Sequence, residues 1–296
     1  MLKLNGIYTP LPTSFDSAEE LSVDKIKENI KELSKYELSG FLVLGSNGEL
    51  VNLNDKEREQ VYQAAREAIP PEKAFLAGTG CQSTRQTIEL TKKAANAGAD
   101  AAVVLNPFYY KGLMTKEALK SHYFAIADAA TIPIIIYNMP ANSGLDMDAD
   151  TIKTLSNHKN ILGLKDSGGN ITKMGEIKTD TESDFQVLAG SAGFLLPALS
   201  VGAKGGILAL SNIAPQECID LYKSFMEGKI QEARKIQLRI IKLNNAVTRK
   251  WGIPALKEAM NYKGLYGGPA RQPLLPVNGE VKEKIHNLMK GVSNHT

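Results

Sequence analysis

The stretch Ile161-Leu-Gly-Leu-Lys165-Asp-Ser-Gly-Gly169 has the pattern of a short buried strand that ends in a lysine and runs into two glycines. It is one of eight short apolar runs along the chain, and segments with helical periodicity separate them. The predicted strands are residues 6–9, 40–44, 74–77, 101–105, 134–137, 161–164, 185–188 and 206–209. Strands that alternate with helices in this way predict a parallel sheet with right-handed crossovers.

Eight such units can close into a (β/α)8 TIM barrel, which belongs to the α/β class. Near-continuous apolar strands are also typical of a parallel sheet whose outer face is covered. The competing architecture, an open doubly wound sheet, usually carries a glycine-rich dinucleotide turn after its first strand, and Ile7-Tyr-Thr-Pro-Leu-Pro12 is not such a turn. We therefore predict a barrel over residues 1–214 and an appended C-terminal helical region over residues 215–296 that packs on it.

Composition excludes several classes of protein. The 296 residues are 43% hydrophobic, which suffices for a large core, and the net charge of +3 without charge blocks does not favour nucleic acid. Two cysteines without a CxxC pair and four scattered histidines predict neither a disulfide framework nor a metal site. No apolar run approaches the roughly 18 residues of a membrane span, and no signal peptide precedes the first strand, so we expect a cytoplasmic protein.

Polar residues follow the predicted strands at their carboxyl ends, where a barrel of this kind carries its chemistry. These segments are Gly45-Ser-Asn-Gly-Glu49, Asn106-Pro-Phe-Tyr-Tyr-Lys-Gly112, Tyr137-Asn-Met-Pro140, Lys165 itself and Gly190-Ser-Ala-Gly193. Because the fifth and sixth strands are neighbours in a barrel, Tyr137 and Lys165 should project into the same mouth. The sequence therefore predicts an amine and a phenol side by side.

This pair suits Schiff-base chemistry on a 2-oxo acid. An unprotonated lysine is a nucleophile, and burial favours the unprotonated form. Lys165 would supply the amine, and Tyr137 would relay protons to and from it. Backbone N–H groups of the glycine-rich turn Gly45–Gly48 would hold the acid's carboxylate, since such a turn before a helix points donors at anions.

Each of these features also has a purely structural interpretation. Lys165 could pair with Asp166 or point into solvent, and Tyr137 could be an interior tyrosine that is bonded to backbone. The turn Gly45–Gly48 could only cap the next helix, and Gly190–Gly193 could be a phosphate cradle. A non-catalytic protein that binds 2-oxo acids on the same barrel is a further alternative, although mere binding would not require the lysine.

Taken together, the ordered motifs resemble the dihydrodipicolinate synthase / N-acetylneuraminate lyase family of pyruvate-dependent class I aldolases. The resemblance implies four catalytic residues, which are Lys165, Tyr137, Ser46 and Tyr109. Tyr109 would reach into the site of a neighbouring subunit. The substrate-binding residues that we expect are Asn47, Gly48, Asn142, Gly190, Ser191 and Ile207. The family resemblance also implies a homotetramer built as a dimer of dimers, with no metal or organic cofactor.

Within the family, the motifs are most similar to those of 4-hydroxy-2-oxoglutarate aldolase, which releases pyruvate and glyoxylate. Dihydrodipicolinate synthases usually carry an arginine after the tyrosine motif, and Asn142 stands in that place here. Losing a bidentate, permanently charged donor is not a conservative change. Two alternatives stay open: a synthase that condenses pyruvate with aspartate semialdehyde, and an aldolase or dehydratase for a 2-keto-3-deoxy sugar acid.

Overall fold

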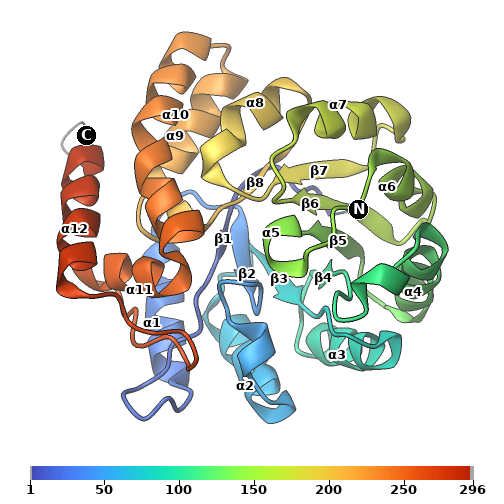
Figure 1. The fold of residues 1–296 in the computed structure, drawn as a ribbon, viewed down its shortest axis with the longest axis horizontal. Coiled ribbons are helices and arrows are strands. Elements are labelled where there is room, and N and C mark those ends of the chain that lie inside the picture. The colour runs from blue at the N-terminus through green and yellow to red at the C-terminus, as the bar shows by residue number, and fades with distance from the viewer. Residues whose placement is uncertain (1, 294–296) are drawn as a thin grey trace.

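The computed structural model describes residues 2–293, and its eight strands close into a parallel barrel (Figure 1). The strands are β1 Gly6–Pro10, β2 Gly40–Val43, β3 Ala74–Gly78, β4 Ala101–Leu105, β5 Ile134–Asn138, β6 Ile161–Asp166, β7 Gln186–Ala189 and β8 Gly205–Ile207. Each strand pairs with its neighbours in chain order, and β8 pairs with β1 to close the barrel. The predicted (β/α)8 architecture is therefore confirmed.

Seven strands end at a different residue from the one predicted, five of them by one residue and two by two residues. The sixth was predicted over residues 161–164 with Lys165 at its end, but β6 continues to Asp166, so Lys165 lies inside the strand. The eighth was expected to reach Ala209, but β8 ends at Ile207 and a 3-10 helix over Ala209–Asn212 follows. The Ser211 hydroxyl accounts for this turn locally, because it donates to the Leu208 carbonyl at 2.7 Å.

Helices cover the outside of the barrel. They are α1 Val23–Leu33, α2 Asp55–Ala68, α3 Thr84–Asn96, α4 Lys116–Ala129, α6 Ala149–Ser156, α7 Ile171–Asp180, α8 Leu195–Ser200 and α9 Pro215–Met226, whereas the short α5 Pro140–Ser143 lies at the barrel mouth. The chain then adds α10 Ile230–Asn245, α11 Gly252–Tyr262 and α12 Gly279–Ser293, with a π-helical turn over Ala246–Lys250. The short α5 directly follows β5 and lies near the middle of the view in Figure 1.

Local sequence signals fix where several helices begin. The Asn54 side chain accepts from the Glu57 N–H at 3.0 Å, while the Glu57 carboxylate accepts from the Asn54 N–H at 2.8 Å. This capping box satisfies two N–H groups that a helix start otherwise leaves unpaired. Three other helices have a simple N-cap, in which one side-chain oxygen accepts from one backbone N–H. The capping residues are Ser83 for α3, Thr115 for α4 and Asp148 for α6.

The core has two layers, because successive strand residues point to opposite faces of the sheet. In β5, Ile134 and Ile136 pack against the outer helices, whereas Ile135 and Tyr137 point into the barrel. The interior layer also contains Tyr8, Leu42 and other residues whose side chains fill the barrel. Tyr137 thus occupies an inward position at the carboxyl end of its strand.

The C-terminal helices form a further layer at one side of the barrel. Helix α9 contacts β1 and α8, α10 packs on α9, and α12 contacts both α10 and α11 (Figure 1). A helical region after the barrel was predicted and is present. Helix α11 also approaches the barrel mouth, since Ile253 near its start lines the cavity described below.

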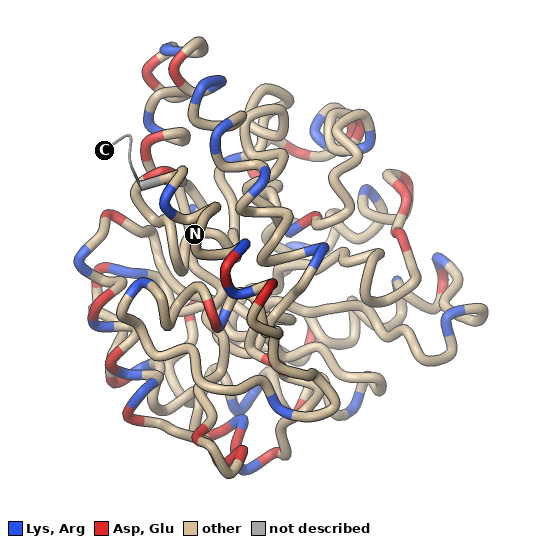
Figure 2. The backbone as a smooth tube through the Cα atoms, turned by 60° about the vertical axis from the view of Figure 1, so that its left-hand side comes forward, with Lys and Arg blue, Asp and Glu red and all other residues tan. Residues whose placement is uncertain are grey.

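The surface carries mixed charge. Figure 2 shows Lys and Arg interspersed with Asp and Glu along the helices in that view. Over residues 2–293, no helix has both the length and the apolar character that crossing a membrane requires.

Candidate active site

Lys165 and Tyr137 lie directly opposite each other on adjacent strands. The register pairs Tyr137 of β5 with Lys165 of β6, and both side chains are almost completely buried, with 4% and 3% exposed. The Lys165 Nζ atom lies 3.9 Å from the centre of the Tyr137 ring. Sequence reasoning placed these two groups in one mouth, and the structure brings them into contact.

Ser46 extends this pair towards the loop after β2. Its Oγ atom lies 3.2 Å from the Tyr137 hydroxyl, within hydrogen-bond distance. Burial raises the pKa of Tyr137, but the Lys165 charge and the hydroxyls of Ser46 and Ser167 outweigh burial, and the pKa lies below its ordinary value. A phenol with a lowered pKa gives up its proton more readily near neutral pH, which suits a group that must both take and return protons.

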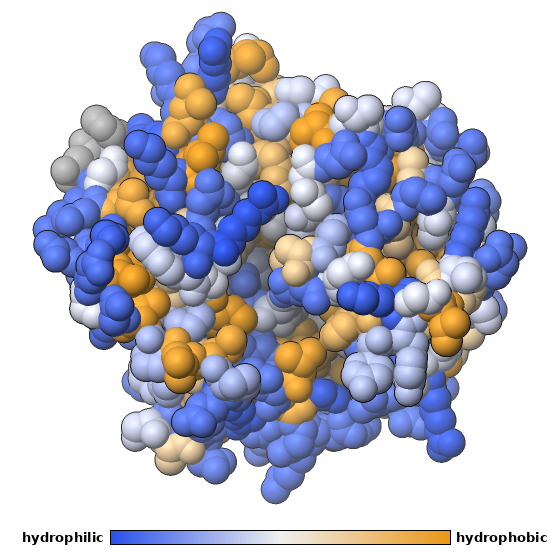
Figure 3. Space-filling model, viewed as in Figure 1, coloured by the Kyte–Doolittle hydropathy of each residue, from blue (hydrophilic) through white to orange (hydrophobic). Residues whose placement is uncertain are grey.

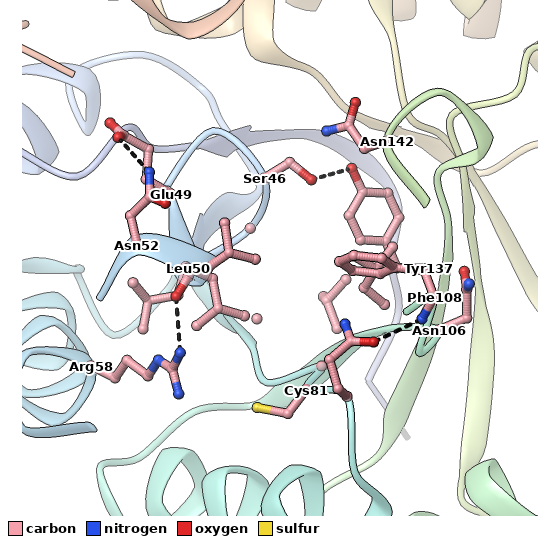
Figure 4. Close-up of a pocket in the computed structure, with 18 of the residues that line it drawn as sticks. Ser46, Glu49, Leu50, Asn52, Arg58, Cys81, Asn106, Phe108, Tyr137 and Asn142 are labelled. Atoms are coloured by element: carbon pink, nitrogen blue, oxygen red, sulfur yellow. Dashed lines mark hydrogen bonds between the residues drawn. The ribbon is translucent and has the colours of Figure 1, made fainter. Parts of the chain in front are cut away.

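Ser46 and Tyr137 border a cavity of about 580 Å³ at the carboxyl ends of β2–β5, and Lys165 is not one of its lining residues. Figure 4 shows Ser46, Tyr137 and Asn142 around one end of it, and Arg58 and Cys81 around the other. The face of the molecule that carries α5 is hollowed near its middle (Figure 3). The volume falls within the range of about 300–1,000 Å³ that is usual for small-molecule sites.

The loop Gly45–Glu49 forms one wall of the cavity and is anchored from two sides. The Gly48 carbonyl accepts a hydrogen bond of 2.6 Å from the buried Thr13 hydroxyl. The Glu49 carboxylate forms an ion pair with Lys257 of α11, with 2.8 Å between Oε1 and Nζ and both side chains buried. The Lys257 ammonium also donates a hydrogen bond of 2.6 Å to the Pro269 carbonyl.

A buried polar network lies directly beyond the catalytic pair. Asp166 accepts from the Asn138 amide at 2.8 Å and contacts the Lys173 ammonium at 3.2 Å. The network links the ends of β5 and β6, one residue past Tyr137 and Lys165. Asp166 thus has Lys173 as its partner, and a structural pair between Lys165 and Asp166 is not what the structure shows.

The other residues predicted for the site occupy different surroundings. Asn142 and Tyr109 line the cavity, and the Tyr109 side chain is 75% exposed. Ile207 is fully buried inside the barrel, in the same cluster as Tyr137. Asn47 lies in the loop next to Ser46, and it is half-buried.

Gly190 and Ser191 lie at the end of β7. A Cβ atom on Gly190 would come within 2.0 Å of the Ser167 Oγ, so only glycine permits this close approach. Ser191 Oγ accepts from the Asn244 amide of α10 at 3.0 Å, which ties this turn to the C-terminal helices.

Sequence reasoning missed several residues of the site. Ser167 was quoted in a motif but given no role, although its hydroxyl lowers the pKa of Tyr137. Arg58 and Asn106 line the cavity, and Lys257 holds the loop through Glu49. The position of Asn106 directly after a strand was an available signal. No local signal predicted the pairing of Lys257, since its partner Glu49 is 208 residues away along the chain.

The chain matches one known protein family over almost its whole length. The sequence profile of the Dihydrodipicolinate synthetase family matches residues 3–292. The chain belongs to this family. Its enzymes are class I aldolases and lyases that act on small pyruvate-derived substrates, so the protein is a lyase. The family resemblance found in the sequence motifs is confirmed.

Relatives within the family carry different names. A probable mitochondrial 4-hydroxy-2-oxoglutarate aldolase from Emericella nidulans is 38% identical over 281 residues, covering 93% of this chain and 90% of that protein. A 4-hydroxy-tetrahydrodipicolinate synthase from Methanothrix thermoacetophila is 30% identical over 294 residues, covering 98% of both.

Solved structures of the family have the same fold. Dihydrodipicolinate synthase DapA-2 from Bacillus anthracis superposes with a TM-score of 0.94 at 30% identity, over 98% of this chain and 99% of that one. The family member YagE from E. coli K12, solved in complex with pyruvate, gives a TM-score of 0.92 at 28% identity, over 98% and 99%.

Proposed function

We propose that the protein cleaves 4-hydroxy-2-oxoglutarate to pyruvate and glyoxylate through an imine on Lys165. The observation that carries this proposal is the buried amine of Lys165, 3.9 Å from the ring of a tyrosine whose hydroxyl is within hydrogen-bond distance of Ser46. The name of the Emericella nidulans relative supports this choice of substrate. The rest of the mechanism follows from where these groups lie.

The reaction begins with imine formation. Lys165, whose ammonium charge lowers the pKa of Tyr137, first passes a proton to the ionised phenol, and the amine so formed attacks the C2 carbonyl of the acid. The carbinolamine that results loses water to give an iminium ion. Tyr137 supplies the proton that leaves with the hydroxyl as water, and Ser46 relays protons between this tyrosine and the cavity. Backbone N–H groups of Gly45–Gly48, with the Asn47 amide, hold the C1 carboxylate beside the imine.

Cleavage of the carbon–carbon bond follows. The ionised Tyr137 takes the proton of the C4 hydroxyl, the C3–C4 bond breaks, and its electron pair passes to the iminium as an enamine. Glyoxylate leaves with the new C4 carbonyl. Protonation at C3 and hydrolysis then release pyruvate and regenerate the Lys165 amine. No metal or organic cofactor takes part in this proposal, because the iminium itself is the electron sink.

A synthase that condenses pyruvate with aspartate semialdehyde is the second candidate. The name of the Methanothrix thermoacetophila relative favours it. The uncharged Asn142 at the cavity speaks against it, because an arginine would grip the second carboxylate there with two parallel hydrogen bonds. An aldolase or dehydratase for a 2-keto-3-deoxy sugar acid is supported only by the size of the cavity.

We further propose that the active form is a homotetramer. Tyr109 lines the cavity although three quarters of its side chain is exposed, and Tyr110 and Leu113 on the same loop are exposed as well. Large exposed apolar groups gathered in one place mark contact surfaces. A second copy of the chain packed here would bury these residues at the mouth of the site.

The deciding experiment measures pyruvate release from 4-hydroxy-2-oxoglutarate, coupled to lactate dehydrogenase. We expect steady release by the parent enzyme and none by Lys165→Ala, and borohydride with pyruvate should add mass to the parent only. Release without covalent trapping would overturn the imine, whereas trapping without release would overturn the substrate. In the latter case the same assay is run with pyruvate plus aspartate semialdehyde and with longer keto-deoxy acids.

A further inference from the structure

The proposed substrate carries two carboxylates, and the site described so far accounts for only one of them. The loop Gly45–Gly48 provides neutral backbone donors for the carboxylate next to the reacting carbonyl. The second carboxylate lies at the other end of the molecule, towards the cavity mouth. Asn142 borders that part of the cavity but is uncharged. A dicarboxylate therefore needs a cation from another element.

Arg58 is the one arginine among the described residues that line the cavity, and it is partly engaged. Its guanidinium donates to the Leu50 carbonyl at 3.1 Å and pairs with Asp55 at 2.9 Å, while its buried Nε has no hydrogen-bond partner. These contacts hold it at the end of the cavity away from Tyr137 (Figure 4). Arg58 is therefore poorly placed to meet an acid whose C2 atom is bonded to Lys165.

Lys111 lies beside the cavity, on the loop after β4, and is not itself one of the lining residues. It begins the 3-10 turn Lys111–Leu113 after β4, two residues beyond the cavity-lining Tyr109. The Gln82 side-chain carbonyl accepts from the N–H groups of both Phe108 and Tyr109, at 3.0 and 2.9 Å. These two bonds fix the backbone of the loop that carries Lys111.

The Lys111 ammonium reaches across to the end of α5. A Cβ atom added to Gly144 would lie 3.3 Å from the Lys111 Nζ. Gly144 has φ of +67°, a left-handed conformation that favours glycine, and it ends the helix that begins just after β5. Gly144 thus gives the ammonium room beside α5, two residues from Asn142.

Lys111 has no acidic partner in the part of the chain that the structure describes. Asp146, two residues beyond Gly144, pairs with Lys173 instead. The side chain of Lys111 thus brings an unneutralised charge, on a flexible four-carbon stem, to the rim between the β4 loop and α5. A cation in this position is available to an anionic ligand.

We propose that Lys111 is the specificity-determining cation that receives the distal carboxylate of a dicarboxylic 2-oxo acid, with Asn142 as a neutral neighbour. This inference rests on the proposed imine at Lys165. The Lys111 charge makes the aldolase selective for acids that end in a second carboxylate. It also explains how the site accepts such an acid without an arginine at position 142. The charge is supplied by the β4 loop and not by α5.

The test compares two acids of equal length that differ in the distal carboxylate. Borohydride trapping on Lys165 is measured with 2-oxoglutarate and with 2-oxopentanoate, and the two half-saturating concentrations give a preference ratio. We expect the parent to favour 2-oxoglutarate roughly fivefold, as one exposed charge pair at the upper end of the usual range would give. Lys111→Met should remove most of this preference, and Lys111→Arg should keep it.

Two controls separate a local contact from a general effect of charge. Lys116→Met removes an exposed lysine at the start of α4, five residues along the same segment, and should leave the ratio unchanged. Raising the salt concentration should lower the parent's preference, because screening weakens an exposed charge pair. The ratio for Lys111→Met should be insensitive to salt.

The outcomes distinguish this inference from the proposed function. Equal trapping of the two acids by the parent, or a preference that survives in Lys111→Met, would overturn the role of Lys111 while leaving the imine intact. A loss of preference in Lys116→Met as large as in Lys111→Met would also overturn it. Failure of every 2-oxo acid to trap would overturn the imine, and this inference with it.

Discussion

Tyr137 is subject to two opposing effects. Its burial inside the barrel favours the neutral phenol, whereas the ammonium of Lys165 and the neighbouring hydroxyls favour the phenolate. The second set prevails, so the phenol is poised to give up its proton. A group that exchanges protons with a substrate works best when neither form is strongly preferred.

Tyr137→Phe should therefore slow turnover far more than it weakens binding. Proton transfer by a positioned group typically contributes about 10²–10⁴-fold, and we expect kcat to fall within that range. The concentration of pyruvate that half-saturates borohydride trapping at equilibrium should change little, since Lys165 and the carboxylate loop remain. A variant with near-normal kcat would remove Tyr137 from the mechanism.

Ser46→Ala should raise the pKa of Tyr137. The hydroxyl of Ser46 stabilises the phenolate, and without it burial is opposed by fewer groups. The measurement is a pH titration of tyrosinate absorbance. Because the chain has ten tyrosines, a Tyr137→Phe background must be subtracted. A pKa that stays the same or falls would show that Ser46 does not stabilise the phenolate.

At the scale of elements, His122 joins two helices and makes the fold sensitive to acid. Its Nδ1 atom lies 2.9 Å from the Thr84 hydroxyl at the start of α3, and burial lowers the pKa of His122 to about 4. Between that value and the usual 6.5, the unfolded chain binds a proton that the folded protein does not. Stability from this group is therefore present above pH 6.5 and is lost as the pH falls towards 4.

Replacing His122 by Leu should flatten this dependence. A shift of this size corresponds to about 3 kcal/mol of unfolding free energy between the two pH limits. Urea unfolding at several pH values would measure it, with the difference between parent and variant isolating His122 from other acidic groups. Parallel pH profiles of the two proteins would contradict the assignment.

The ion pair between Glu49 and Lys257 joins α11 to the loop Gly45–Glu49, which we propose holds the C1 carboxylate of the substrate. Burial lowers the pKa of Lys257, and Glu49 opposes this effect. Removing one partner of a buried pair typically costs about 3–5 kcal/mol, because the other charge is left without compensation. We expect Lys257→Met to destabilise the protein by that amount in urea unfolding and to raise the pyruvate concentration needed for trapping.

A matched control for Lys257 is Lys35→Met. Lys35, just past the end of α1, pairs with the exposed Glu32 of that helix, and such surface pairs contribute roughly 0–1 kcal/mol. The double variant Glu49→Gln with Lys257→Met should be less destabilised than the sum of the single variants. Additive effects would show that the two groups do not interact.

Most elements could be predicted from local pattern, and the exceptions have physical reasons. The helical pattern of residues 84–96, followed by alanine and glycine, predicts a helix that matches α3, and Ser83 caps its start. Helical patterns over residues 229–245 and 254–262 predict α10 and α11 to within two residues. The four-residue α5 was not predicted, since it is too short for a helical period to show.

The site was predictable only in part. Lys165, Tyr137 and Ser46 could be brought together from the order of the strands, because parallel strands place their carboxyl ends at one edge. The contacts of Asp166 with Lys173, and of Lys111 with Gly144, depend on how loops cross the mouth. No local pattern records such crossings.

At the scale of the whole molecule, exposed apolar residues gather around the cavity mouth. Val51, Tyr109, Tyr110 and Leu113 are each between 68% and 75% exposed. If these side chains form the contact between copies, Leu113→Asp should shift the protein to smaller species, because an unpaired charge in an apolar contact is costly. Analytical ultracentrifugation should show about four times 32.1 kDa for the parent.

Activity should fall together with this change in assembly. The variant is expected to keep its fold by circular dichroism but to release pyruvate more slowly, since Tyr109 would no longer complete a neighbouring site. Leu238→Asp, on the exposed face of α10, is the matched control and should stay tetrameric. A parent enzyme that is monomeric and fully active would contradict the proposed assembly.

The pairing of Glu49 with Lys257 also bears on how the protein is made. The ribosome synthesises the loop early and its partner late, and the two are separated by most of the barrel. In a nascent chain that stops before Lys257, the Glu49 carboxylate has no Lys257 ammonium to neutralise it at a position that is buried in the folded protein. The loop Gly45–Glu49 therefore reaches its final form only after Lys257 has been synthesised and has packed against it.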